Sequence, residues 1–159
     1  MSNREIKQQT QSIFTAEEYK QSFVRNKKGK KEEKVQLQVC DYLRHTYPDL
    51  IWFCDLASGL KLPIWLGVLH AKMRSSRGLP DLFIAKPKWE YAKGEGVKYN
   101  GLFIELKRDG IRLKNGEMPK TPHIKEQAEI LARLNQQGYK SCFAAGAKEA
   151  IDIINEYLK

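Results

Sequence analysis

Two short hydrophobic runs, residues 79–85 and residues 101–107, are each interrupted by an acidic side chain. Both have the length of a short β-strand, in which successive side chains alternate between two faces. Glu105 and Lys107 therefore share one face of the second run. Acids inside otherwise apolar strands make these two runs the first candidates for a functional site.

Pairing between the two runs would bring their acids together. In an antiparallel pair the numbers of facing residues always add up to the same total. If Phe83 lies opposite Phe103, Asp81 therefore lies opposite Glu105. Two carboxylates directly opposite repel each other, and one pKa rises, unless a cation neutralises them. A divalent metal ion is the simplest such cation.

Helical spacing of apolar residues predicts a helix over residues 32–46. Glu32 lies beside the apolar stripe, since residues three and four apart are neighbours on a helix, and it points inward better than Glu33 does. The alternative is that both are ordinary first-turn acids favoured by the helix dipole. The stripe consists of Val35, Val39, Tyr42 and Leu43.

A second helix is predicted to begin at Thr121-Pro122, with proline in its first position and Gly138 after its end. Gln127 and His123 lie beside its apolar face, and a lone histidine there is more simply a capping or surface residue than a ligand. The apolar face consists of Ile124, Ala128, Leu131 and Leu134.

The remaining pattern predicts a buried strand at residues 50–54, a strand at residues 141–145 and an amphipathic helix at residues 147–158. Residues 60–73 are apolar and fit either a short helix after Pro63 or a loop packed on the sheet. The elements add up to an α/β fold with a small mixed β-sheet flanked by helices.

The segment between the two acidic strands, residues 86–99, interleaves aromatic residues with lysines. This mixture suits stacking on unpaired nucleic-acid bases. A plain hairpin with a cross-strand aromatic cluster is the simpler alternative, because Gly94 and Gly96 mark turns. The aromatic residues are Trp89, Tyr91 and Tyr99.

The chain has 159 residues and a formal net charge of +9, which favours a polyanionic partner such as nucleic acid over a membrane surface. Residues 1–31 carry eight Lys and Arg against three Glu, so they predict a basic, flexible arm ahead of a single domain at residues 32–159. Basic residues near the acidic strands are candidate phosphate contacts: Lys72, Arg74, Arg77, Arg108 and Lys114.

Three cysteines, Cys40, Cys54 and Cys142, are odd in number and widely spaced. They predict buried free thiols in a reducing cytoplasm and argue against a disulfide framework or a zinc site. The first ten residues are polar, unlike a signal peptide, and no stretch has the length of a transmembrane span.

Pro80-Asp81 followed at a distance by Glu105-Leu106-Lys107 resembles the PD-(D/E)xK nuclease superfamily. Within it, the Gly78 to Leu82 strand, the Glu105 strand and the Gln127 helix are similar to the VRR-NUC family of stand-alone phage and bacterial nucleases. The resemblance extends from Glu32 to about Lys148. It implies the superfamily's nuclease-like core, with element order αβββαβ.

This resemblance implies a metal-dependent DNA endonuclease that selects branched or junction DNA in a bacterial or phage-infected cell. Asp81, Glu105 and the backbone carbonyl of Leu106 would hold Mg²⁺ or Mn²⁺, and Lys107 would act on the attacking water. Glu32 would hold a metal-bound water or a second metal ion. Gln127 would steady Lys107 or a phosphate oxygen.

Cleavage of two strands would require a homodimer, because one small domain holds one cutting site. The apolar residues 60–69 are a candidate interface. Two alternatives remain: a non-catalytic nucleic-acid-binding module that keeps the nuclease fold, and a sequence-specific restriction-type nuclease. The intact acids and lysine count against the first, and the lack of an added reader domain counts against the second.

Overall fold

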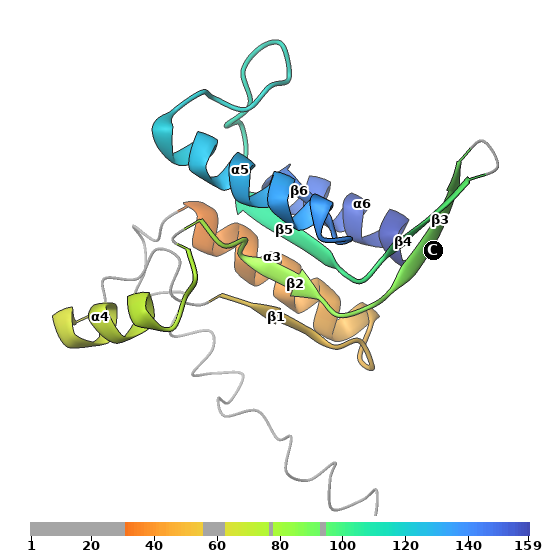
Figure 1. Ribbon diagram of the computed structural model, residues 1–159, viewed down its shortest axis with the longest axis horizontal. Helices are drawn as coiled ribbons and strands as arrows, with labels where there is room; N and C mark the ends of the chain where they lie inside the picture. Colours follow the sequence, from red (N-terminus) through yellow and green to blue (C-terminus); the bar gives the residue numbers. More distant parts are fainter. Residues whose placement is uncertain (1–30, 56–62, 77, 93–94) are drawn as a thin grey trace, which may run out of the picture.

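The computed structural model describes residues 31–55, 63–76, 78–92 and 95–159 (Figure 1). The basic arm predicted for residues 1–31 lies outside this part of the chain, apart from Lys31, and so does Arg77. The first described element is helix α3 (Lys31–Thr46), which confirms the helix predicted at residues 32–46.

A four-stranded mixed sheet forms the centre of the fold, with strand order β1-β2-β5-β6. The first three strands of this order pair antiparallel, whereas β5 and β6 pair parallel. The strands are β1 (Trp52–Cys54), β2 (Leu82–Ile84), β5 (Leu102–Lys107) and β6 (Lys140–Ala145). This confirms the prediction of a small mixed sheet in an α/β protein.

Two helices, α3 and α6 (Gly146–Leu158), pack against one face of this sheet, and α5 (Pro122–Gln136) lies against β5 and β6 on the opposite face (Figure 1). Apolar side chains from α3, α6 and alternate positions of the strands form one buried cluster. Its largest fully buried members are Tyr157, Leu43, Leu82, Ile84, Leu102, Ile104, Leu106 and Ile154.

The predicted register between the two acidic runs is confirmed, because Phe83 pairs with Phe103 in the antiparallel β2–β5 ladder. Between these strands the chain forms a separate two-stranded antiparallel sheet, β3 (Lys88–Ala92) and β4 (Glu95–Tyr99). The hairpin interpretation of residues 86–99 is therefore confirmed. Its two stacked aromatic rings, however, come from one strand, Trp89 and Tyr91 on β3.

Residues 64–72 form a helix, α4 (Ile64–Lys72), which decides between the two interpretations of this apolar stretch. None of its residues is buried, so it is not packed on the sheet. Strand β1 is less buried than predicted, since Phe53 is 58% exposed. Trp52 and Cys54, on the other face of β1, pack against the core. Phe53 lies on the face covered by α5, and that helix packs on β5 and β6, so it leaves the edge strand exposed.

Helix α5 begins as predicted, with the Thr121 hydroxyl accepting a hydrogen bond from the Ile124 N–H and Pro122 in the first turn. Gly138 follows the helix with φ = +82°, a left-handed conformation that favours glycine. The predicted apolar face was misplaced at one position. Ala128 is exposed and Gln127 is buried, so the buried face of α5 includes the Gln127 side chain in place of Ala128.

The three cysteines are free, as predicted, and half-buried where full burial was expected. Among the described residues, no helix has the length and apolar character needed to cross a membrane.

Candidate active site

Asp81, Glu105 and Lys107 meet where β2 begins and β5 ends. Each of the three residues is less than 5% exposed. The β2–β5 register, extended by one residue, sets Asp81 opposite Glu105. The Lys107 ammonium donates a hydrogen bond of 2.7 Å to Glu105 Oε1. The structure thus brings together the three residues that the sequence ranked as its principal site.

Asp81 is held in place by the backbone of the strand opposite. Strand β2 starts at Leu82, which leaves the N–H of Leu106 beyond the ladder without a strand partner on that side. The Asp81 carboxylate replaces the missing strand partner and accepts a hydrogen bond of 2.9 Å from the Leu106 N–H. A buried N–H requires such a partner, so the end of the ladder itself fixes the position of the acid.

Gln127 reaches the same cluster from helix α5. Its Nε2 donates to Glu105 Oε1 at 2.5 Å, so Gln127 and Lys107 both donate to one carboxylate oxygen. Glu105 Oε2 and Gln127 Oε1 are buried and have no hydrogen-bond partner among the described residues. Two acceptor oxygens without donors are unusual in a protein interior and fit a bound cation or water.

The electrostatics of the cluster are dominated by buried negative charge. Burial raises the pKa of Glu105 to about 8, and the Asp81 carboxylate adds to this rise, while Lys107 lowers it and the charge of Glu32 raises it slightly. One ammonium group therefore does not compensate for the carboxylates around it. Another cation at this place would relieve the repulsion.

Helix α3 contributes two polar residues on its inward side, four positions apart. Glu32 is half-exposed at the start of the helix, and its charge acts on Glu105. Gln36 is buried one turn further along, at 8% exposure, although the sequence reasoning gave it no role. Its signal in the sequence was the i, i+4 spacing from Glu32 beside the apolar stripe.

Four of the five basic residues predicted to contact phosphates belong to the described part of the chain, and their surroundings differ. Arg74 forms an ion pair with Asp55, and His70 Nε2 lies 3.8 Å from the same carboxylate, so this part of the chain is tied to the end of β1. Lys72, Arg108 and Lys114 are exposed. Their role in binding stays a prediction.

Arg112 is a residue that the sequence reasoning missed. Its guanidinium forms an ion pair with Glu149 and donates a hydrogen bond of 3.0 Å to the Gly116 carbonyl. Glu149 in turn accepts from the Ala145 N–H at 3.1 Å, at the start of α6. This network fastens the basic loop after β5 to the body of the domain. A single arginine in a loop gives no periodic signal by which it could have been found.

The described residues contain no group of three or more His, Cys, Asp or Glu side chains arranged to hold a metal ion. The donors that are present are oxygens: two closely placed carboxylates, one with a buried oxygen lacking a partner. Oxygen ligands of this kind suit Mg²⁺ or Mn²⁺, which keep part of their water shell, better than Zn²⁺, whose sites are mostly built from His and Cys.

The fold and cluster together define a mixed α/β domain with a buried Asp-Glu-Lys site at the end of two antiparallel strands. A solved structure described as "VRR_NUC domain protein" is similar to this chain, with a TM-score of 0.51 and 24% sequence identity. The similarity covers 82% of this chain and 90% of that one. No family model matches the sequence, and no curated protein does either. The chain therefore has a VRR-NUC-like fold.

Proposed function

We propose that this protein is a divalent-metal-dependent DNA endonuclease with the PD-(D/E)xK core of the VRR-NUC family. The observation that carries the proposal is the buried Asp81–Glu105–Lys107 cluster at the place where β2 and β5 meet, in a fold like that of a VRR_NUC domain protein. The net charge of +9 supports a polyanionic substrate.

Asp81 and Glu105 would hold Mg²⁺ or Mn²⁺, together with the backbone carbonyl of Leu106. The N–H of Leu106 faces Asp81, and the N–H and carbonyl of one strand residue point to the same edge, which supports that third ligand. When bound, such an ion lowers the pKa of a coordinated water and neutralises charge on the phosphate.

The chain's own residues supply orientation and charge. Lys107 would position the attacking water and stabilise charge on the scissile phosphate, since its ammonium already lies within hydrogen-bond distance of Glu105. Gln127 would fix the rotamer of Glu105 and leave the other carboxylate oxygen to the metal. Glu32, whose charge reaches Glu105, would hold a metal-bound water or a second ion.

The substrate would be branched or junction DNA, in the cytoplasm of a bacterial or phage-infected cell. Exposed Lys72, Arg108 and Lys114, with the basic residues 1–31, would contact the phosphate backbone. Such contacts add affinity and orientation without reading a base sequence.

Helix α4 supports a homodimer, which would give one cutting site for each strand. It presents Ile64 and Trp65, 88% and 68% exposed, on a helix with no buried residue, and an apolar surface of this kind is typical of a protein interface. The substitution Trp65→Glu should convert the dimer to a monomer, and analytical ultracentrifugation measures the change in mass. The exposed apolar residue Leu113, on the loop after β5, gives a control in Leu113→Glu, which should leave the mass unchanged. A monomeric wild-type protein at micromolar concentration would refute the dimer.

Cleavage is tested by incubating four-way junction, flap, single-stranded and duplex DNA with Mg²⁺, with Mn²⁺ and with chelator. Metal-dependent cleavage is expected, and Asp81→Asn, Glu105→Gln and Lys107→Met should each reduce it at least about 100-fold while DNA binding in chelator persists. Asp152→Asn, an exposed acid paired with Lys148 on α6, is the control.

Two results would overturn this proposal. Absence of cleavage of every substrate under every metal condition would favour a binding module that keeps the nuclease fold. Cleavage that survives Glu105→Gln would show that the site lies elsewhere.

A further inference from the structure

The β3–β4 hairpin extends beyond the main sheet at the end where β5 begins, away from the catalytic cluster (Figure 1). Its ladder pairs Lys88 with Tyr99 and Glu90 with Val97 on one side, and Trp89 with Lys98 and Tyr91 with Gly96 on the other. Because alternate residues point to opposite faces, the hairpin has two chemically distinct faces.

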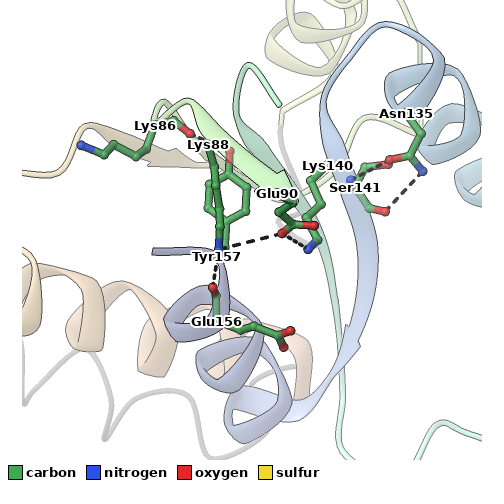
Figure 2. Close-up of polar contacts among 8 residues, drawn as sticks. All are labelled: Lys86, Lys88, Glu90, Asn135, Lys140, Ser141, Glu156 and Tyr157. Atoms are coloured by element: carbon green, nitrogen blue, oxygen red, sulfur yellow. Dashed lines mark hydrogen bonds and ion pairs between the residues drawn. The ribbon is translucent and has the colours of Figure 1, made fainter. Parts of the chain in front are cut away.

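The first face is fastened to the domain, as Figure 2 shows. Lys88 Nζ donates to the Glu156 carbonyl at 2.7 Å, and Glu90 forms an ion pair of 2.5 Å with Lys140 of β6. The Tyr157 hydroxyl donates to the Lys86 carbonyl at 2.6 Å, just before β3. These contacts tie the hairpin to both β6 and α6, so its orientation relative to the sheet is fixed.

The second face is open to solvent and carries aromatic rings. Trp89 and Tyr91 remain 55% and 78% exposed, although their rings stack with centroids 6.3 Å apart and planes inclined by only 16°. Gly96 makes this possible, because a methyl group there would lie 2.9 Å from the Tyr91 ring and 3.4 Å from that of Trp89. Two aromatic rings that remain mostly exposed to water contribute little to the packing of the hairpin, so their exposure calls for another explanation.

Charge on the same face favours an anionic ligand. Lys98 lies directly across the ladder from Trp89, is exposed, and forms no ion pair with a described residue. The acid of β3, Glu90, is on the fastened face and already paired with Lys140. Nearly parallel aromatic rings beside a lysine that has no counter-ion among the described residues suit nucleobases attached to phosphates. The π-faces of the bases would stack on the rings, and the phosphate would contact the ammonium.

We propose that Trp89, Tyr91 and Lys98 form a binding surface for unpaired bases of a DNA strand, separate from the catalytic cluster. Lys98 and Glu105 are seven residues apart, so the two surfaces are separated by at most about 25 Å. A DNA strand stacked as in a duplex, at about 3.4 Å per nucleotide, spans that distance in about seven nucleotides, and an extended single strand needs fewer. The surface would therefore hold an unpaired strand within about seven nucleotides of the position where the proposed nuclease cuts. The distance to a cut position rests on the proposed function, whereas the binding of unpaired bases does not.

The test measures binding of the full chain in chelator, by fluorescence anisotropy of labelled oligothymidylate and of a duplex of equal length. Trp89→Ala should weaken single-strand binding about 5- to 140-fold, as expected for the loss of one stacked base, and should leave duplex binding unchanged. Trp89→Phe keeps a ring and should restore most of the affinity. Lys98→Met should lower the salt slope of single-strand binding by about 0.7, the contribution of one phosphate contact.

Val97→Ala is the matched control, because Val97 is half-exposed on the same hairpin but on the opposite face, and it should change neither affinity. Circular dichroism of each variant verifies that the fold is retained. The proposal is wrong if the double variant Trp89→Ala, Tyr91→Ala binds oligothymidylate as the wild type does, or loses duplex binding equally.

A change in sedimentation mass of that double variant, without a change in oligonucleotide affinity, would identify the face as a protein contact and also refute the proposal. Failure of the nuclease proposal would appear differently. Metal-dependent cleavage would be absent while the affinity losses of the Trp89 variants persisted.

Discussion

The buried charge of Glu105 makes the stability of the metal-free protein depend on pH in a way that one substitution should remove. Glu105→Gln keeps the shape of the side chain and an oxygen that can accept from Lys107 and Gln127. It eliminates the titrating proton. Comparing the wild type with this variant isolates the contribution of one carboxyl group from all other titrating groups.

The magnitude follows from the pKa of Glu105, which burial, and then Asp81, raise from 4.5 to about 8. Between these values the folded protein holds a proton that the unfolded chain has released, so the free energy of unfolding falls as the pH rises from about 4.5 to about 8. A difference of one in pKa corresponds to about 1.36 kcal/mol, so the full loss approaches roughly 5 kcal/mol. Below pH 4.5 both states are protonated and the group contributes nothing.

The assay is urea unfolding in chelator at a series of pH values, followed by circular dichroism. Above pH 8 the Glu105→Gln protein should be several kcal/mol more stable than the wild type, and near pH 4.5 the two should be equal. Adding Mg²⁺ above pH 8 should stabilise the wild type and not the variant. Asp152→Asn should follow the wild type throughout. If wild type and Glu105→Gln lose stability in parallel between pH 4.5 and 8, the reasoning about this site is refuted.

Two further substitutions test how the fold holds the site. Leu43→Ala removes a fully buried side chain beneath the sheet and should lower the free energy of unfolding by about 2–5 kcal/mol. Leu113 is half-exposed, so Leu113→Ala should change this free energy by less than about 0.5 kcal/mol. Equal effects of the two substitutions would contradict the assigned core. Gly146→Ala should cost about 1–3 kcal/mol, because Gly146 has φ = +87° and a Cβ there would collide with the Asp109 carboxylate. Gly67→Ala, inside α4 with open space around it, should instead be neutral or stabilising by up to about 1 kcal/mol, and thermal denaturation compares the two.

Much of the site followed from the alternation of side chains along two strands. Pairing Phe83 with Phe103 was predicted from sequence, and this register alone sets Asp81 opposite Glu105. The helices over residues 31–46 and 122–136 were predicted from apolar spacing and capping residues, because both signals are local. Local signals of this kind determine which residues share a face and where an element begins and ends.

Tertiary packing decided what local patterns leave open. Gln127 was predicted to lie beside the apolar face of its helix, and the structure buries it while exposing Ala128, because the helix turns its amide toward Glu105. Phe53 was predicted in a buried strand, and it is exposed because α5, the helix on its face of the sheet, packs on β5 and β6 and not on β1. Which strands that helix covers depends on strand order and not on the residues of β1.

The sequence by itself determined the strand register, the acids that meet across it and the basic character of the chain. Only the tertiary structure decided which oxygen of Glu105 is taken by Lys107 and Gln127, and which is left without a donor. It also decided that the β3–β4 hairpin is fastened by one face and open on the other. The physical reason is that both outcomes depend on contacts between segments far apart in the chain, for which periodicity carries no information.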